Sequence, residues 1–250
     1  MLELKGLSYQ VEGGGTQTDI LRGIDLTIPD GSFVVITGPN GGGKTTLAKA
    51  IMGLVQPTGG QILWNGTDIT HMSITERAKL GVSYGFQQPP RFKGLRVRDL
   101  LGLAAGDRKL SRDACCSYLN RVGLCAADYV ERDMDAALSG GEVKRIEIAT
   151  LLARPGGLLI FDEPEAGIDL WSFAKLTETF RLLHDKGDAT IIVISHQERI
   201  INLADEIVML SAGRVVSHGP RSEVMPNILT STGSVCSFFQ TGDSCRQKED

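Results

Sequence analysis

The stretch GPNGGGKT at residues 38–45 decides the fold. It fits the pattern of a glycine-rich loop whose backbone N–H groups wrap phosphates at the positive end of the following helix. The apolar run Phe33–Ile36 before it predicts a buried strand, and helix-forming residues follow from Lys44 to Leu54. The sequence thus predicts a strand, a phosphate-binding loop (the P-loop) and a helix, in that order.

In such a loop the lysine, here Lys44, meets the β- and γ-phosphates, and the hydroxyl of Thr45 reaches Mg²⁺. The expected ligands are therefore ATP and Mg²⁺. The alternative is a glycine-rich turn that holds no ligand, and the buried strand before the loop favours the P-loop. The other residues expected around the phosphates are Gly38, Asn40, Gly41, Gly43 and Thr46.

A second apolar run, Leu158–Phe161, ends in two acids, Asp162 and Glu163. This pattern is typical of a Walker B segment, in which the first acid holds Mg²⁺ through water. The second acid would lie beside the γ-phosphate, where a carboxylate orients and polarises the attacking water. The alternative is a pair of acids that simply ends a buried strand, and the P-loop upstream argues against it.

The sequence LSGGE at residues 138–142 precedes an amphipathic helix that carries Val143, Ile146 and Ala149 on one face. Its serine and glycine amides would lie at a helix N-terminus, which attracts anions. Taken alone, the stretch is a helix-capping box. Its place shortly before the Walker B segment favours a functional role for this stretch over a simple helix cap.

The motifs together resemble the ATP-binding cassette (ABC) ATPases over about residues 1–220. Their order is typical of that family: Walker A at 38–45, the LSGG signature at 138–141, Walker B at 158–163, a D-loop at 166–169, and His196 after the next strand. The resemblance implies that one domain's signature, here Ser139 and Gly141, covers the γ-phosphate on the P-loop of another. A single domain would then be incomplete.

The resemblance assigns further roles. His196 matches the switch histidine that contacts the γ-phosphate, although a histidine at a strand end is more often structural. Gln87 resembles the Q-loop glutamine that senses Mg²⁺, and the adjacent Gln88 is the alternative. Tyr9 stands where the family has an aromatic that stacks on adenine; otherwise it is a half-buried strand tyrosine. The expected catalytic residues are Glu163, His196 and Lys44, and those expected near the metal are Thr45, Gln87 and Asp162.

Composition agrees with a folded globular protein, since 42% of the 250 residues are hydrophobic and 22% are charged. No apolar stretch approaches the roughly 20 residues that cross a bilayer, so we expect no direct membrane insertion. The net charge of −4 does not favour nucleic acid as a partner. The first residues lack the layout of a secretion signal, and the five cysteines have no zinc or disulfide spacing, so we expect a cytoplasmic protein.

The expected fold class is α/β: a P-loop NTPase (RecA-like) core with an N-terminal antiparallel β subdomain and an inserted helical subdomain. Alternating apolar residues on both sides of a Gly13–Gly15 turn predict the β subdomain. Leu, Ala, Asp and Arg at helical spacing predict the insertion at about residues 91–155. One ABC domain would span residues 1–229, and residues 230–250 would form a C-terminal extension.

Two departures from the usual motifs of transporter ATPases indicate a particular subfamily of the ABC ATPases. The signature reads LSGGEVKR instead of LSGGQ, and residues 163–169 read EPEAGID where transporters have SALD in the D-loop. Glu142 and Glu165 make the chain look like the SufC-type ATPase of the Suf iron–sulfur cluster assembly system, in its minimal two-component form; the alternative is drift at exposed loop positions. The resemblance implies a SufB-like scaffold and ATP-dependent pairing with a second ABC chain. The rival is the nucleotide-binding subunit of a transporter with separate membrane proteins.

Overall fold

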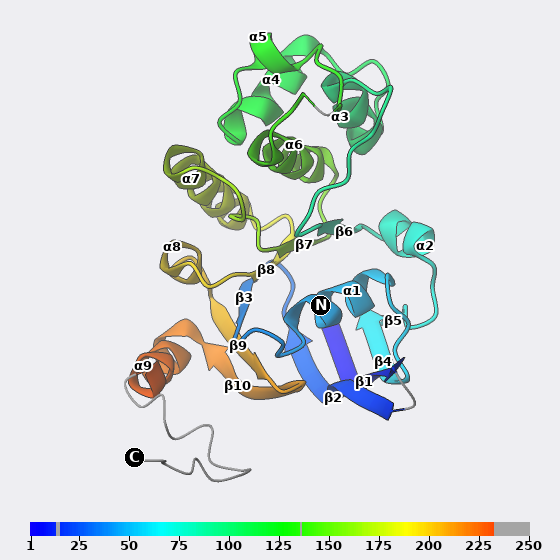
Figure 1. Ribbon diagram of the computed structural model, residues 1–250, viewed down its shortest axis with the longest axis vertical. Helices are drawn as coiled ribbons and strands as arrows, with labels where there is room; N and C mark the ends of the chain where they lie inside the picture. Colours follow the sequence, from blue (N-terminus) through cyan, green and yellow to red (C-terminus); the bar gives the residue numbers. More distant parts are fainter. Residues whose placement is uncertain (14–15, 136, 233–250) are drawn as a thin grey trace, which may run out of the picture.

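The computed structural model describes residues 1–13, 16–135 and 137–232. The predicted turn residues Gly14 and Gly15 lie outside the described residues, as does the predicted C-terminal extension beyond residue 232. Two sheets form the lower part of the molecule in Figure 1, and helices gather above them. No helix among the described residues is both long and apolar enough to cross a membrane.

The first sheet is antiparallel, with strand order β2-β1-β4-β5. Its strands are β1 (Leu2–Gly13), β2 (Thr16–Ile28), β4 (Gly59–Trp64) and β5 (Thr67–Asp68). Leu2 of β1 pairs with Ile28 of β2, and both side chains are fully buried. Leu4 is also buried, and Leu7 is buried beyond a register shift in β1; the pairing confirms the predicted antiparallel strands.

The second sheet has the order β10-β9-β3-β8-β7-β6 and is parallel except at the β9–β10 pair. Its strands are β3 (Phe33–Thr37), β6 (Val82–Gly85), β7 (Leu158–Asp162), β8 (Thr190–Ile194), β9 (Glu206–Ser211) and β10 (Arg214–Pro220). Strands β3, β7 and β8 are buried along their whole length, because both faces of this sheet are covered. Strands β7 and β8 are parallel neighbours, and β9 and β10 form an antiparallel hairpin.

The described residues also form helices, among them those predicted after the P-loop and in the insertion. They are α1 (Lys44–Met52), α2 (Ile74–Lys79), α3 (Val97–Ala105), α4 (Arg112–Arg121), α5 (Ala126–Tyr129), α6 (Gly140–Ala153), α7 (Leu170–Lys186), α8 (Glu198–Ile201) and α9 (Arg221–Thr232). Helices α3 to α6 gather at the top of Figure 1, above the end of the second sheet that carries β6 and β7. Within α6, the three apolar residues assigned to one face are all buried.

Two apolar cores meet at the second sheet. Phe33 and Val35 of β3 pack into the core beneath α6 and α7, whereas Val34 and Ile36 pack into the core shared with α1 and the first sheet. Successive side chains of a strand point to opposite faces, so one strand serves both cores. This arrangement fixes the loop after β3, which is the P-loop, between the two halves of the molecule.

A fully buried arginine holds the far end of α1. The guanidinium of Arg77 donates to the carbonyls of Ala50 (2.6 Å), Ile51 (2.8 Å), Thr70 (2.8 Å) and Met72 (3.1 Å). Two of these carbonyls, Ala50 and Ile51, belong to the last turn of α1, where few backbone donors are left; the Ala50 carbonyl also accepts from the N–H of Gly53 (3.1 Å). Arg77 therefore fixes the helix that begins at the P-loop.

Replacing Arg77 by methionine is expected to lower the free energy of unfolding by about 3 kcal/mol, because each orphaned buried carbonyl costs about 1–3 kcal/mol. Urea unfolding followed by circular dichroism measures the change. The matched control is Lys79→Met. Lys79 is exposed and lies on α2 with Arg77, so this change should alter stability little. Equal stability of the two variants would show that water replaces the guanidinium without loss.

Candidate nucleotide-binding and catalytic site

The P-loop connects β3 to α1 and requires glycine at its first position. Gly38 has φ +134°, and a Cβ there would lie 2.0 Å from the carbonyl oxygen of Leu210. Gly43, directly before α1, is left-handed with φ 100°. The loop can therefore turn tightly against β9 and present backbone N–H groups at the N-terminus of α1, where the helix dipole favours anions.

A cavity of about 480 Å³ opens over this loop. Most of its lining was predicted from the sequence, but Ile20 and Gly42 were not. The lining residues are Ile20, Asn40, Gly41, Gly42, Gly43, Lys44, Thr45, Thr46, Gln87 and Glu163. The cavity thus brings together the P-loop, Gln87 in the loop after β6 and Glu163 directly after β7.

Lys44 is buried at the floor of the loop. Its Nζ donates to the carbonyls of Gly38 (2.8 Å) and Pro39 (2.9 Å). Burial lowers the pKa of the ammonium, and the nearby carboxylates of Glu163 and Asp162 oppose that shift. A phosphate oxygen would offer this desolvated cation a stronger acceptor than a neutral carbonyl.

Asp162 is fully buried and lies next to Thr45. The Thr45 hydroxyl donates to Oδ1 of Asp162 (3.1 Å), and the Tyr84 hydroxyl donates to Oδ2 (2.8 Å). Desolvation raises the pKa of Asp162, and the two hydroxyl donors oppose the shift. Hydroxyl and carboxylate oxygens are the hard donors that Mg²⁺ prefers, so this pair fits the predicted metal. The role of Tyr84 was not predicted, because a tyrosine in a buried strand looks like an ordinary core residue.

Glu163 has a strained backbone. Its φ is 47°, a left-handed value that is uncommon for a residue other than glycine, and its N–H donates to the carbonyl of Ile194 (3.0 Å). Its Oε2 accepts a hydrogen bond from Nε2 of Gln87 (2.8 Å). Gln88 is exposed and has no hydrogen bond to a site residue among the described residues. This geometry favours Gln87 over Gln88 as the Q-loop residue.

His196 follows β8, between the loops after β3 and β7, because β8 lies between those strands in the sheet. Its Nδ1 is 3.5 Å from the hydroxyl of Thr37, the last residue of β3. Desolvation lowers the pKa of the imidazole, the charge of Lys44 adds to that shift, and Glu163 opposes it. His196 is therefore neutral at pH 7 and faces the same edge of the sheet as the P-loop.

Ser139 and Gly141 do not line the P-loop cavity in the described part of the chain. Ser139 is the N-cap of α6, and its hydroxyl accepts from the N–H of Glu142. Gly141 packs against the D-loop, since a Cβ there would lie 2.6 Å from the carbonyl oxygen of Gly167. The signature thus forms an exposed helix N-terminus beside the D-loop of the same chain.

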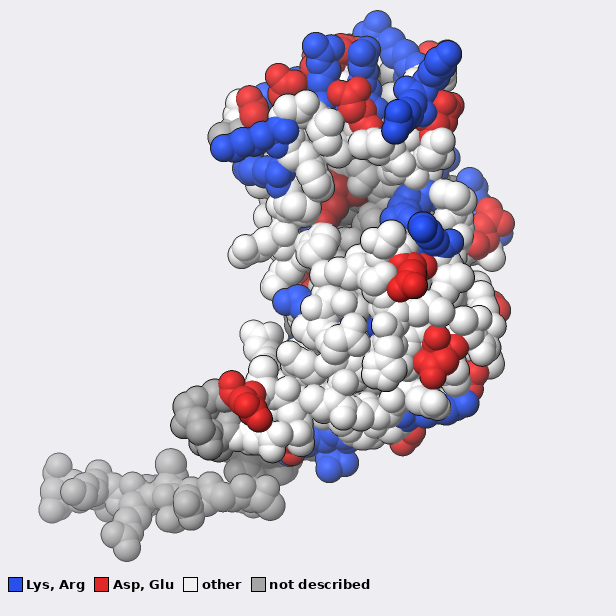
Figure 2. Space-filling view, turned by 90° about the vertical axis from the view of Figure 1, so that its right-hand side faces the viewer, with Lys and Arg blue, Asp and Glu red and all other residues white. Residues whose placement is uncertain are grey.

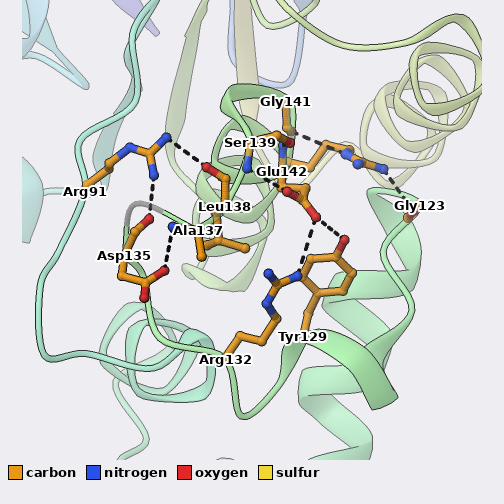
Figure 3. A network of polar contacts seen from close by, with 11 residues as sticks. Arg91, Gly123, Tyr129, Arg132, Asp135, Ala137, Leu138, Ser139, Gly141 and Glu142 are labelled. Carbon is orange, nitrogen blue, oxygen red and sulfur yellow. Dashed lines mark hydrogen bonds and ion pairs between the residues drawn. The ribbon is translucent and has the colours of Figure 1, made fainter.

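Glu142 is tied into the signature network of Figure 3. Its Oε2 accepts from the N–H of Ser139 (2.6 Å), its Oε1 accepts from the Tyr129 hydroxyl, and Arg132 lies 3.6 Å away. The Tyr129 hydroxyl, followed by the Ser139 N–H, lowers the pKa of Glu142 to about 2. Its side chain is 18% exposed. Glu142 is therefore ionised, and hydrogen bonds hold its side chain in place. These surroundings differ from those of an exposed loop position at which the residue type could vary freely.

Glu165 lies in the interior of the D-loop region. The Ser195 hydroxyl donates to its Oε1 (2.6 Å), and its Oε2 is buried without a hydrogen-bond partner among the described residues. Burial raises the pKa of this carboxyl, and the Ser195 hydrogen bond opposes the shift. Glu165 connects the residues after Walker B to Ser195, which directly precedes His196.

Replacing Glu165 by glutamine is expected to raise Tm at pH 8 by about 2–4 °C, the shift that about 1 kcal/mol makes in a chain of this size. A raised pKa in the folded state means that the wild-type carboxyl contributes most below its ordinary value of 4.5, and that this contribution is lost as pH rises through the folded pKa. The neutral amide avoids that loss, so the gain should be larger at pH 8 than at pH 5.

Differential scanning calorimetry at the two pH values measures this gain. The control is Glu198→Gln, at an exposed glutamate, which should show no such pH dependence. A Glu165→Gln variant that is less stable than wild type at pH 8 would mean that the buried carboxylate is needed in its charged form.

Tyr9 does not line the P-loop cavity within the described residues. It is half-buried, pairs with Leu21 of β2 and packs partly on the core beneath the first sheet. Ile20, the residue before Leu21, reaches the cavity instead. An apolar side chain at the cavity wall gives no distinctive signal in the sequence, which is why Ile20 was missed.

Comparison with known proteins gives consistent matches. The family model described as "ABC transporter" matches residues 21–166, and one described as "AAA domain, putative AbiEii toxin, Type IV TA system" matches residues 136–202. An uncharacterized ABC transporter ATP-binding protein of Methanocaldococcus jannaschii is 39% identical over 82% of this chain and 85% of its own length. The probable ATP-dependent transporter ycf16 of Cyanophora paradoxa is 33% identical over 88% of each chain.

Solved structures match the fold. A dimeric ATP-binding cassette in a post-hydrolysis state with ADP and Pi has a TM-score of 0.78 and 23% identity, over 88% of this chain and 99% of its own. A nucleotide-free cassette from an ABC transporter has a TM-score of 0.77 and 22% identity, over 96% of this chain and 99% of its own. These likenesses confirm the predicted α/β fold class.

Proposed function

Because the chain belongs to the ATP-binding cassette family of ATP hydrolases, we propose that two copies of it sandwich MgATP and drive a SufB-like scaffold in iron–sulfur cluster assembly. The observation that carries the Suf-type role is the pair Glu142 and Glu165, which replace the usual transporter residues. The side chain of Glu142 is held by hydrogen bonds beside the signature, and that of Glu165 accepts from the Ser195 hydroxyl and has one buried oxygen. These specific contacts support a functional reason for glutamate at both positions over sequence drift at exposed loops.

In this proposal Lys44 leaves the carbonyls of Gly38 and Pro39 and binds the β- and γ-phosphates of ATP. The other P-loop residues, Asn40, Gly41, Gly43 and Thr46 with the carbonyl of Gly38, shape the phosphate cradle. Thr45 would hold Mg²⁺ through its hydroxyl and Asp162 through water, with Gln87 nearby; the metal would neutralise part of the phosphate charge.

Glu163 acts as the general base in this account. Its carboxylate accepts the proton of the attacking water as the water oxygen bonds to the γ-phosphorus and the bond to ADP breaks. Gln87 already orients one carboxylate oxygen. His196, neutral in the free chain, can donate a hydrogen bond to the γ-phosphate from one ring nitrogen.

The second copy supplies the signature. Ser139 and Gly141 do not line the cavity over the P-loop of their own chain, which supports an action on the nucleotide of another. ATP can pull two chains together only if it binds the closed pair more tightly than the open one. The N-terminus of α6 on the γ-phosphate provides this difference, because helix amides favour anions.

We assign partner contact to the groove between the loop after β6 and helices α3 and α6. This groove is about 370 Å³ in volume and mostly apolar, with Glu147 and Arg154 as its charged members. Its lining residues are Pro90, Phe92, Leu100, Leu103, Ala104, Met134, Ile146, Glu147, Thr150, Leu151 and Arg154. Figure 2 shows the molecule hollowed between its upper and lower parts, with charged side chains crowded over the upper, helical part.

A second candidate function is the nucleotide-binding subunit of a transporter with separate membrane proteins. The similar proteins favour it, because one is described as an ABC transporter ATP-binding protein and another as a probable ATP-dependent transporter. The same groove would then receive a membrane protein. The site chemistry is common to both candidates, so the partner distinguishes them.

Affinity capture of the tagged chain from both soluble and detergent-extracted fractions of its own cells tests the choice. Bound proteins are identified by mass spectrometry, and the eluate is assayed for iron and acid-labile sulfide. We expect a soluble SufB-like protein with labile sulfide. Membrane-spanning partners without iron would overturn the Suf-type role and favour the transporter.

Replacing Leu103 by aspartate is expected to weaken partner capture by about tenfold or more, since burying an unpaired charge costs several kcal/mol. Leu103 lines the groove and is 57% exposed, so the free chain should tolerate the change. The control is Val216→Asp on β10, at 52% exposure and outside the groove lining. Equal capture by both variants would place the partner elsewhere.

A further inference from the structure

Segment 86–92 joins the candidate site to the helical part of the chain. At its start, the N–H of Phe86 donates to Glu147 on α6 (2.9 Å), and the carbonyl of Phe86 accepts from Lys144 on the same helix. The Glu147 and Lys144 side chains are only 10% and 2% exposed. The following residue is Gln87, which reaches the catalytic carboxylate. One end of the segment is thus fixed by buried charges.

Arg91 anchors the other end of the segment. Its guanidinium donates through Nη2 to the carbonyl of Leu138 (2.9 Å) and through Nη1 to the carbonyl of Asp135. Figure 3 shows this side chain reaching across to the backbone that leads into α6. The neighbours Pro90 and Phe92 both line the groove assigned to the partner. Arg91 therefore connects the groove wall to the backbone that leads into the signature.

The two acceptors of Arg91 lie next to the signature. Leu138 directly precedes Ser139, the N-cap whose hydroxyl and backbone begin α6. Asp135 also accepts, through its side chain, from the N–H of Ala137 (2.9 Å). A planar guanidinium with donors on two nitrogens holds two carbonyls in a fixed relation, which a single-point cation cannot do. Movement of Arg91 would therefore move the start of the signature.

We propose that Arg91 is a positioning residue that holds the signature in place for the ATP of the second copy. The inference rests on the pairing in the proposed function. It assigns Arg91 no contact with nucleotide: the guanidinium acts only through the carbonyls of Leu138 and Asp135. Its loss would impair the site that the signature faces, and leave the P-loop site of its own chain intact.

Mixed chains separate these two sites. Wild-type chain is held at a low concentration at which few copies pair. A Glu163→Gln chain, which is expected to bind ATP and to hydrolyse it far more slowly, is added in excess as signature donor. The donor should raise turnover per wild-type chain. A donor that carries both Glu163→Gln and Arg91→Ala should give an increase in turnover that is at least about 10-fold smaller. The reason is that misplacement of a positioned group by about 1 Å can lower the rate about 10²-fold.

The reverse mixture tests direction. Arg91→Ala chain at low concentration, with Glu163→Gln donor in excess, should reach the same stimulated turnover as wild type. A donor that carries Lys93→Ala is the matched control, because Lys93 is an exposed cation of the same loop with no hydrogen bond or ion pair found in the described part of the chain. An Arg91→Lys donor, which keeps the charge, should recover only part of the stimulation.

Equal stimulation by donors with and without Arg91 would overturn the proposal and leave the pairing intact. Reduced stimulated turnover of the Arg91→Ala chain, when the Glu163→Gln donor supplies the signature, would also overturn the proposal. Arg91 would then act on the P-loop site of its own chain. If even the Glu163→Gln donor fails to stimulate wild type, the pairing in the proposed function is wrong, and this inference falls with it.

Discussion

Replacing Glu163 by glutamine is expected to lower kcat for ATP hydrolysis by about 10²–10⁴-fold, the usual contribution of a positioned general base. The amide keeps the shape and the contact with Gln87 but cannot accept a proton from water. MgATP binding should persist, because the P-loop and Asp162 are unchanged. Steady-state phosphate release measures kcat, and equilibrium titration with a fluorescent ATP analogue measures affinity.

Glu198→Gln is the control, since it makes the same chemical change at an exposed position on α8. It should retain wild-type turnover. If Glu163→Gln also turned over at the wild-type rate, the general base would be another group. The strained backbone at Glu163, with φ 47°, would then need a different explanation.

Replacing Lys44 by alanine is expected to weaken MgATP binding by about 10²-fold, because hydrogen bonds to a charged partner contribute about 1.5–3 kcal/mol each. Hydrolysis should fall with it. In the free chain the Lys44 ammonium bonds two carbonyls of the P-loop and is 6% exposed, so it is already in place for the phosphates. Isothermal titration with MgATP measures the affinity.

Lys49→Ala, at the last turn of the same helix, is the matched control and should bind MgATP normally. A Lys44→Ala chain with unchanged affinity would show that the backbone N–H groups alone hold the phosphates. A circular dichroism spectrum equal to wild type is needed in each case, so that lost binding is not confused with lost folding.

Sequence reasoning predicted the parts of the fold that short local sequence motifs specify. The P-loop glycines, the apolar run of β7 and the cap at Ser139 each have a meaning within a few residues. The order of the resulting loops in the sheet then follows from parallel strands joined by crossovers. This order explains why Lys44, Asp162 and His196, which were predicted from three separate motifs, lie at the same edge of the sheet.

The contacts that were missed are made between distant segments. Tyr84 and Asp162 are 78 positions apart, and Arg91 and Leu138 are 47 apart. Nothing in either stretch marks its partner, because a strand tyrosine and a loop arginine are common residues. Glu165 was read as a family marker, but its burial beside Ser195 depends on how β8 packs against the D-loop, which only the structure shows.

The central claim is that one chain carries an incomplete site and that ATP brings two copies together. Light scattering after size-exclusion chromatography of the Glu163→Gln chain, with and without MgATP, tests it most directly. The account predicts the mass of one 26.9-kDa chain without nucleotide and of two chains with it. A chain that stays single with MgATP bound, and whose wild-type turnover does not depend on protein concentration, would contradict the account.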